Sequence, residues 1–401
     1  MKKLSLLILT VCLLMPFTAQ AAEYMSITKM RETAPDRWVE TYKTKWRTIE
    51  VDAEIRLPDT ETVPILKVGY PNREPEQGWT IAEYGGEHFL QTDIEGWDEV
   101  ESRPDAFVLY NYDKKTVPRK VDGKQINKDA EAAGQWYSGF APENTYIPMC
   151  DITYGELCDM IRAELTRFGY DAKDFRLEMP NRLWAHHWYL YGYKKDVLPG
   201  YIMLEAAQKL HGLPYLSHIQ QAVSDGDSSY VRWYEPSLLF CGIYAGYDGY
   251  QEQMAHIFVE NMEILETPAE DVPLCSIDKV IRAIEPMIEK GNIRKVYEIT
   301  LGYVGYNEPG TYRTKSDDLA PTDMPTYYFK PAWQVNCLYL KSATGKLRET
   351  ASYTTDERNS LDYKQFIVDA QTGKLIEESR AQDRCEYTGF ISWEKAGGKA
   401  E

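Results

Sequence analysis

Tyr363-Lys-Gln-Phe-Ile-Val-Asp-Ala-Gln-Thr-Gly-Lys-Leu-Ile376 is the stretch that decides the fold of this chain. Its apolar residues alternate along a strand up to Asp369, and a second strand follows Thr372-Gly373. Gly373 can adopt the positive φ of a tight hairpin, and the Asp369 carboxylate can accept a hydrogen bond from a backbone amide two residues further along. The pattern therefore predicts an antiparallel hairpin whose polar residues form its turn.

The sequence around this hairpin predicts further strands of the same sheet. A second Thr-Gly-Lys-Leu, which contains Gly345, lies between two strand-like runs, and Pro331-Ala-Trp333 precedes both copies. We expect Trp333, Asp369, Gly373 and Gly345 to be structural residues of the sheet and its turns. The expected antiparallel meander has strands at 332–341, 347–353, 364–369 and 374–378.

A helix is predicted after residue 152. Thr153 and Glu156 form a capping box, apolar residues recur at helical spacing up to Phe168, and Gly169 stands where a helix commonly ends. The strands expected to follow it lie at 175–178, 183–191 and 201–207.

A second helix is predicted over residues 277–289, with Ser276 at its N-cap and Gly291 after its end. Pro286 lies inside it and should kink or shorten its last turn. A strand at 293–303 is expected to place on one face Ile293, Tyr297, Ile299, Leu301 and Tyr303. The repeated order of helix, glycine and strands suggests two related modules.

These elements predict an α+β fold in which each helix packs on a mostly antiparallel sheet. Further strands are expected at 48–55 and 106–110, and a further helix at 250–265. The expected division is a signal peptide at 1–21, an N-terminal strand-containing region at 22–145, a helix-plus-sheet module with a following helix at 150–265, and a second module at 270–401. The N-terminal region is either an independent domain or an arm packed on the modules.

The N-terminus has the pattern of a secretory signal. Lys2 and Lys3 precede an apolar run at 4–17, and Ala19-Gln20-Ala21 predicts cleavage before Ala22. The apolar run is shorter than an ordinary membrane span, although an uncleaved anchor is an alternative. We expect a secreted or extracytoplasmic protein without a membrane span in its mature form.

Charge and cysteine content agree with export. The chain has 45 Lys and Arg against 62 Asp and Glu, a net charge of -17, which disfavours nucleic acid and anionic lipid as partners. Of seven cysteines, Cys12 lies in the signal. Buried free thiols are the simplest expectation for the others, and Cys337–Cys385 is the disulfide to test first, because both are expected on neighbouring strands. The pairing is otherwise left open among Cys150, Cys158, Cys241, Cys275, Cys337 and Cys385.

No motif predicts an enzyme. His186 and His187 would point to opposite faces of a strand, and no histidine spacing matches a metal-binding motif. Gly-x-Ser-x-Gly and a phosphate-binding glycine loop are absent from the sequence. We therefore predict no catalytic residue, cofactor or metal site. A glycosidase pair of carboxylates stays open, since its members can lie far apart in the chain.

Aromatic residues are frequent, with 30 tyrosines and 10 tryptophans. Tyr189, Tyr191 and Tyr193 alternate on one face of an expected strand. Such rows can stack on sugar rings or bind a protein partner. Cross-strand packing on a half-exposed sheet is the simpler interpretation.

The order of helix 277–289, strand 293–303, Tyr327-Tyr-Phe-Lys-Pro-Ala-Trp333 and Phe366-Ile-Val-Asp-Ala-Gln-Thr-Gly-Lys-Leu375 resembles PepSY-like domains. It is most similar to the C-terminal domains of YycI-type regulatory proteins and related exported Gram-positive proteins of unknown function. The likeness covers roughly residues 270–380, with a diverged copy across 150–220. YycI-type proteins keep an N-terminal membrane anchor, from which the predicted cleavage site of this chain departs.

The resemblance implies protein binding without catalysis. PepSY relatives inhibit peptidases as propeptides or modulate membrane sensor kinases from outside the cell, and the family lacks catalytic residues. We therefore expect a secreted or cell-surface protein that binds another envelope protein, a sensor ectodomain or a peptidase. The alternative is a carbohydrate- or cell-wall-binding protein that uses its Tyr and Trp rows, and an extracellular hydrolase is more remote.

Overall fold

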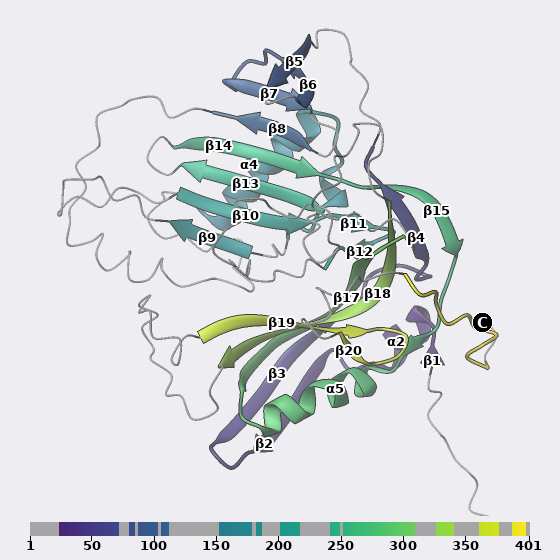
Figure 1. The fold of residues 1–401 in the computed structure, drawn as a ribbon. Helices are drawn as coiled ribbons and strands as arrows, with labels where there is room; N and C mark the ends of the chain where they lie inside the picture. The colour runs from purple at the N-terminus through teal and green to yellow at the C-terminus, as the bar shows by residue number, and fades with distance from the viewer. Residues whose placement is uncertain are drawn as a thin grey trace, which may run out of the picture.

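The computed structural model describes two eight-stranded sheets, each with one long helix against one face (Figure 1). The described residues, to which every structural statement here refers, are 24–71, 80–84, 87–102, 106–111, 152–178, 182–186, 201–216, 241–248, 252–308, 326–340, 361–376 and 387–397. Within these ranges, no helix has both the length and the apolar character needed to cross a membrane.

The first sheet, called the α4 sheet, is antiparallel throughout. Its helix is α4 (Tyr154–Arg167). Its strands, in spatial order, are β5 (Thr80–Tyr84), β6 (Glu87–Thr92), β7 (Glu99–Ser102), β8 (Phe107–Tyr110), β14 (Gln253–Glu260), β13 (Gly242–Asp248), β10 (Tyr201–Ala207) and β9 (Arg182–His186).

Helix α4 begins and ends as its sequence predicts. The Thr153 hydroxyl accepts a hydrogen bond from the Glu156 backbone amide, and the Glu156 carboxylate accepts one from the Thr153 amide. These bonds satisfy two of the amides that a helix N-terminus otherwise leaves without partners. Gly169 then adopts a φ of 80°, which a side chain would strain. The apolar side of α4, including Leu157, Ile161 and Leu165, packs on the sheet.

The second sheet, called the α5 sheet, is antiparallel except where β17 pairs in parallel with β3. Strand β18 pairs with β4 near its start and with β19 further along. The main order is β15 (Glu263–Ala269), β4 (Ile65–Gly69), β18 (Tyr327–Leu340), β17 (Ile293–Asn307), β3 (Thr48–Arg56) and β2 (Arg37–Lys43), and β19 (Leu361–Asp369) and β20 (Leu375–Ile376) complete the sheet.

Helix α5 (Ile277–Glu289) covers the α5 sheet with a narrow apolar stripe. Ile277, Val280, Ile284 and Ile288 are buried in the same core as strand residues of β3, β17, β18 and β19. The helix continues past Pro286 to the predicted end. The Ser276 side chain makes no capping hydrogen bond, so burial of the stripe contributes most of the stability of this helix.

Short elements complete the described chain. They are β1 (Tyr24–Met25), which pairs with β16 (Leu274–Cys275), α2 (Ile27–Thr33), the 3₁₀ turn η1 (Ala172–Asp174), and β11 (Lys209–Leu210), which pairs with β12 (Leu213–Pro214). The strands at 48–55, 106–110 and 201–207 are confirmed as β3, β8 and β10. The mixed architecture of helices on largely antiparallel sheets is also confirmed.

The helix predicted at 250–265 is wrong. These residues form β14 and the start of β15, and β14 pairs with β13 and β8. Met254, Ile257 and Val259 can be placed on a helix or on a strand, and the long-range pairing decides between the two. The strand predicted at 175–178 is also wrong, because the chain forms η1 and then a single bridge between Phe175 and Gln208.

Strand β17 departs from the predicted alternation at two register shifts, between Ile293 and Lys295 and between Val296 and Glu298. A register shift exchanges the faces of the residues beyond it. Val296 is therefore buried in the core, whereas Tyr297 is only half-buried. The prediction of a shared face is wrong for Tyr297.

The N-terminal strands are divided between the sheets: β2, β3 and β4 belong to the α5 sheet and β5 to β8 to the α4 sheet. The proposed boundaries near residues 145 and 270 stay predictions. Cys158, Cys241, Cys275 and Cys337 are buried and form no disulfide, which confirms the simpler expectation of buried thiols. The alternative Cys337–Cys385 disulfide is therefore wrong. Cys385 itself lies outside the described residues.

Candidate functional site

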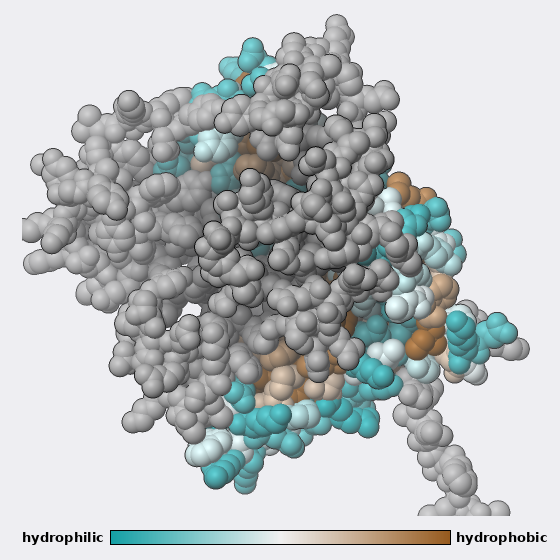
Figure 2. Space-filling model, in the orientation of Figure 1, coloured by the Kyte–Doolittle hydropathy of each residue, from teal (hydrophilic) through white to brown (hydrophobic). Residues whose placement is uncertain are grey.

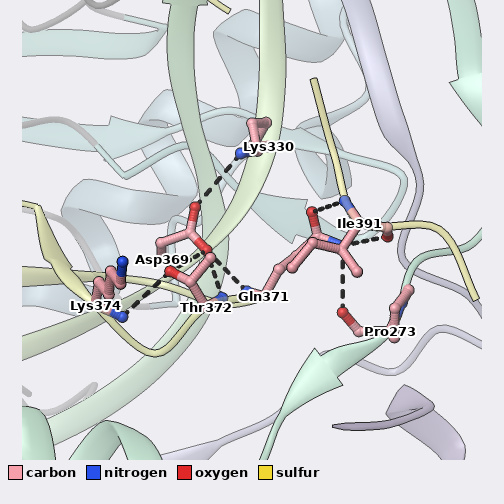
Figure 3. Close-up of polar contacts among 7 residues, drawn as sticks. All are labelled: Pro273, Lys330, Asp369, Gln371, Thr372, Lys374 and Ile391. Atoms are coloured by element: carbon pink, nitrogen blue, oxygen red, sulfur yellow. Dashed lines mark hydrogen bonds and ion pairs between the residues drawn. The ribbon is translucent and has the colours of Figure 1, made fainter. Parts of the chain in front are cut away.

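The Asp369 turn is built as the sequence predicts (Figure 3). Asp369 Oδ1 accepts hydrogen bonds from the backbone amides of Gln371 at 3.0 Å and Thr372 at 2.7 Å, and from the Thr372 hydroxyl at 2.9 Å. Its Oδ2 pairs with Lys330 Nζ at 3.4 Å. Gly373 has a φ of 68° and donates its amide to the Asp369 carbonyl. Both carboxylate oxygens of Asp369 therefore stabilise the turn.

Gln371 connects this turn to two other segments (Figure 3). Its side-chain amide donates to the Ile391 carbonyl at 2.7 Å and to the Pro273 carbonyl at 3.4 Å, and its oxygen accepts from the Ile391 amide at 3.1 Å. The turn thus holds the C-terminal segment 387–397 and the chain that leads into α5.

Trp333 is a core residue. It lies on β18 opposite Leu301 and Val368, and it is fully buried on the side of the sheet that α5 covers. Its indole nitrogen has no hydrogen-bond partner in the described part of the chain. Gly345 and the three tyrosines Tyr189, Tyr191 and Tyr193 lie outside the described residues.

An aromatic and acidic face on the α4 sheet is the main feature that the sequence analysis missed. One row of directly opposite residues crosses five strands as Glu205, Tyr244, Phe258, Val108 and Glu101. The adjacent row contains Gly246, His256, Tyr110 and Glu99. Side chains alternate across a sheet, so this face is opposite the apolar one that packs on α4. We call it the aromatic face.

Three rings are stacked on the aromatic face. The His256 ring lies parallel to that of Tyr244, with centroids 5.2 Å apart, and to that of Tyr110 at 6.3 Å, while Phe258 meets it edge-on at 5.1 Å. Burial lowers the pKa of His256 to about 4, so its imidazole is neutral near pH 7. Burial, with a smaller effect of Glu205, raises the pKa of Tyr244 to about 12.

Tyr110, which is 37% exposed, is the accessible ring of this face, whereas His256, Glu101 and Glu205 are buried. An exposed tyrosine ring can stack on a flat ligand. The alternation of inward and outward residues along β13 and β14 would have revealed the aromatic face. The assignment of 250–265 to a helix concealed that signal, since it placed His256 and Phe258 on different sides.

A buried ion-pair cluster joins the two sheets. Glu298 on β17 lies 3.5 Å from both Arg56 and Arg176 and accepts a hydrogen bond from the Asn336 amide. Arg56 is on β3, whereas Arg176 follows η1 beside the α4 sheet, where its amide donates to the Ala207 carbonyl. Glu54 lies 2.9 Å from Arg56, so the cluster has two carboxylates for its two guanidinium groups, and we assign it to holding the sheets together.

Backbone contacts reinforce this junction. The Leu216 amide donates to the Tyr303 carbonyl at 2.7 Å, and Tyr215 bridges Tyr303. A Cβ on Gly302 would collide with the Pro214 carbonyl, so the close approach of the two segments requires glycine at this position.

Strand β2 presents an exposed outer edge. Strand β2 ends the sheet order and pairs, among the described strands, with β3 alone. Val39 is 71% exposed, and Trp46, in the loop between β2 and β3, is 49% exposed. Within the described residues, no group of three or more His, Cys, Asp and Glu side chains is placed to hold a metal ion.

The class defined by these observations is a strand-rich α+β protein of two helix-covered sheets. No protein-family model matches the chain, and no curated protein matches it. Among solved structures, an uncharacterized protein from Eubacterium rectale is similar, with a TM-score of 0.47 and 16% identity over 86% of this chain and 94% of that one. Similarity at this level gives no information about function.

Proposed function

We propose that this chain is a secreted or cell-surface protein that binds another protein of the cell envelope, a sensor ectodomain or a peptidase, without catalysing a reaction. The observation that supports it most is the regular, exposed edge of β2. We also propose that α5 with β17 to β20 is a PepSY-like module and that α4 with the strands after it is a diverged copy. The resemblance of this part of the sequence to PepSY-like domains favours a protein as the ligand.

Strands β15 and β2, at the two ends of the main strand order of the α5 sheet, differ in how their outer edges are protected. Strand β15 has two register shifts and contains Pro268, devices that discourage pairing with another strand. Strand β2 pairs with β3 over seven consecutive residues without a shift. A long, regular and exposed edge usually binds a partner or risks aggregation. We therefore place the protein-binding site at β2.

Photocrosslinking from the two edges tests this function. The chain is produced with benzoylphenylalanine at Val39 or, as the control, at Ile264 on β15, which is 44% exposed. After irradiation on intact cells of the producing organism, adducts are identified by mass spectrometry. We expect an envelope protein attached at Val39 and absent at Ile264. If Val39 captures only polysaccharide or nothing, the proposed function is wrong.

Carbohydrate binding is the second candidate, and the aromatic face favours it. Tyr110 is 37% exposed beside the buried His256, so its ring can stack on the ring of a sugar. Calorimetric titration with purified cell-wall polysaccharide tests this candidate. Tyr110→Ala should abolish the heat of binding, whereas Tyr297→Ala on the α5 sheet should not. The absence of binding by the unchanged protein would exclude this function.

A further inference from the structure

Hydrogen bonds at the two ends of β2 show which of its backbone amides and carbonyls face away from β3. The Asp36 carbonyl accepts from the Ile55 amide, and the Thr44 amide donates to the Arg47 carbonyl. In an antiparallel pair, residues that bond to the partner strand alternate with residues that face away from it. The even-numbered residues of β2 therefore bond to β3. The amides and carbonyls that face outward belong to Arg37, Val39, Thr41 and Lys43.

The side chains of these four residues share one face and are all exposed. The outer edge thus presents, at alternating positions, a positive charge, an apolar group, a hydroxyl and a second positive charge. Its backbone groups are ready for one further strand, which would lie about 4.8 Å away.

This edge is basic in an acidic chain. Residues 37–47 contain Arg37, Lys43, Lys45 and Arg47 against one acidic residue, Glu40, although the whole chain has a net charge of -17. Lys45 Nζ also lies 4.8 Å from the ring centroid of the exposed Trp46. The corner of the molecule occupied by the β2–β3 hairpin has a mostly hydrophilic surface (Figure 2).

The acidic residues of β3 reduce this positive charge only in part. Arg37 is paired with Asp52 at 2.7 Å, and Glu50 and Glu54 lie on the same face of the hairpin. A strand added outside β2 would lie about twice as far from β3 as from β2. Because Coulomb energy falls with distance and is screened further by salt, the basic residues of β2 dominate its environment.

We infer that β2 binds an extended acidic segment of a partner protein, which adds as a further strand of the α5 sheet. Its backbone pairs with the outward groups of β2, two of its carboxylates face Arg37 and Lys43, and an apolar side chain between them contacts Val39. This inference rests on the proposed function and specifies its partner.

A second copy of the chain fits this edge less well. Antiparallel pairing of two copies centred on Glu40 places Arg37 opposite Lys43 at both ends and Glu40 opposite itself. Like charges directly opposite one another destabilise a strand pair. Two copies also repel through their net charge of -17 each.

Fluorescence anisotropy with a designed peptide tests the inference on the purified full chain. The probe is fluorescein-labelled SDTTTVTDS, which in antiparallel pairing places its aspartates opposite Lys43 and Arg37 and its valine opposite Val39. The control probe, SKTTTVTKS, replaces both aspartates by lysines. We expect saturable binding of the acidic probe and at least roughly tenfold weaker binding of the control, with the difference reduced by salt.

Proline substitution separates strand addition from general charge attraction. Val39→Pro with Thr41→Pro removes two outward amides and spares the bonds to β3, so it should weaken binding roughly tenfold or more. The matched control, Val39→Ala with Thr41→Ala, keeps both amides and should bind within about threefold of the unchanged chain. Lys43→Glu, an exposed change that leaves the fold intact, should weaken the acidic probe and strengthen the lysine probe.

The outcomes distinguish this inference from the function on which it rests. Equal binding of both probes, or full binding by the proline pair, would overturn the strand-addition mode. Dimers seen by sedimentation that the proline pair abolishes would identify a second copy as the occupant instead. If Val39 crosslinks to an envelope protein even in the Thr41→Pro, Lys43→Glu background, protein binding stands and this mode fails. If no protein is captured from either edge, the proposed function itself fails.

Discussion

The α4 sheet and the α5 sheet both bury one apolar face under a helix, and they differ on the face away from it. On the α4 sheet that face carries His256, Tyr244 and the carboxylates of Glu101 and Glu205. On the α5 sheet that face carries Glu298 and Thr300 of β17 and Gln334 of β18, which is opposite Thr300. The same helix-on-sheet arrangement therefore leaves one face for ring stacking and another for ion pairs and amides.

The two faces of each sheet contribute differently to stability. The helix-covered faces consist of apolar side chains whose burial drives folding. The opposite faces bury polar groups, which cost free energy unless they are paired. We therefore expect the polar faces to determine how stability changes with pH and how strongly the two sheets are joined.

The largest expected effect comes from the helix-covered cores. Trp333→Ala should lower the free energy of unfolding by about 3–5 kcal/mol, because a fully buried indole leaves a large cavity. Leu157→Ala, in α4, should cost about 2–5 kcal/mol for the same reason. Urea denaturation followed by circular dichroism measures both, with the exposed Val39→Ala as the control.

These two variants also test whether the sheets unfold together. The junction at Glu298 and Leu216 predicts one cooperative transition that both variants shift to lower urea. Two transitions, with Trp333→Ala moving one and Leu157→Ala the other, would show that the sheets are independent.

The next effect is the acid sensitivity of the α4 sheet. The folded-state pKa of His256 is lowered by burial to about 4, below an unfolded value of about 6.5. Between these values the unfolded chain binds more protons, so stability falls as the pH is lowered from 6.5 towards 4, by roughly 3 kcal/mol in total. His256→Phe keeps a ring in the stack and should remove this loss.

Urea midpoints measured from pH 7 to pH 4 test this contribution. The slope of stability against pH should be smaller in His256→Phe than in the unchanged chain over that range. The exposed Val39→Ala, which removes no titratable group, is the control and should keep the slope of the unchanged chain. Identical slopes for the His256 variant and the unchanged chain would contradict the buried neutral imidazole.

Local sequence signals were sufficient for α4, α5 and the Asp369 turn. The Thr153 capping box, the apolar stripe of α5 and the Asp369–Gly373 turn depend on residues that are close in the chain, so their physics can be read from the sequence. The features that decide pairing between distant strands could not be read in this way. The register shifts of β17 and the strand assignment of β14 depend on partners far along the chain.

The aromatic face shows the same limit at a candidate site. Tyr110, Tyr244 and His256 come from three strands, and only the pairing of β8, β13 and β14 brings their rings together. The edge of β2 was also hidden, because its charged residues are visible in the sequence but its position at the end of a sheet is not. Neither motif spacing nor composition contains that information.

A smaller effect is expected from the Glu298–Arg176 ion pair, which connects the two sheets. Arg176→Met leaves Glu298 paired with Arg56 and Asn336. The free energy of unfolding should therefore fall by less than it would if a buried charge were left without any partner. A double-mutant cycle with Glu298→Gln should give a coupling energy of about 1–3 kcal/mol. A coupling near zero would mean that the backbone contacts of Leu216 and Tyr215 hold the sheets without this ion pair.

The smallest expected effect comes from the N-cap residues, and it should differ between α4 and α5. Thr153→Ala removes a hydroxyl that accepts from the Glu156 amide, and it should lower the free energy of unfolding by about 1 kcal/mol. Ser276→Ala is the matched change in α5, where the side chain makes no capping hydrogen bond, and it should alter stability by less than about 0.5 kcal/mol. Thermal and urea unfolding of both variants give the comparison directly. Equal losses would show that Ser276 caps α5 in solution and that the two helices begin alike, whereas the expected inequality would confirm that α4 depends on its cap and α5 on its buried stripe.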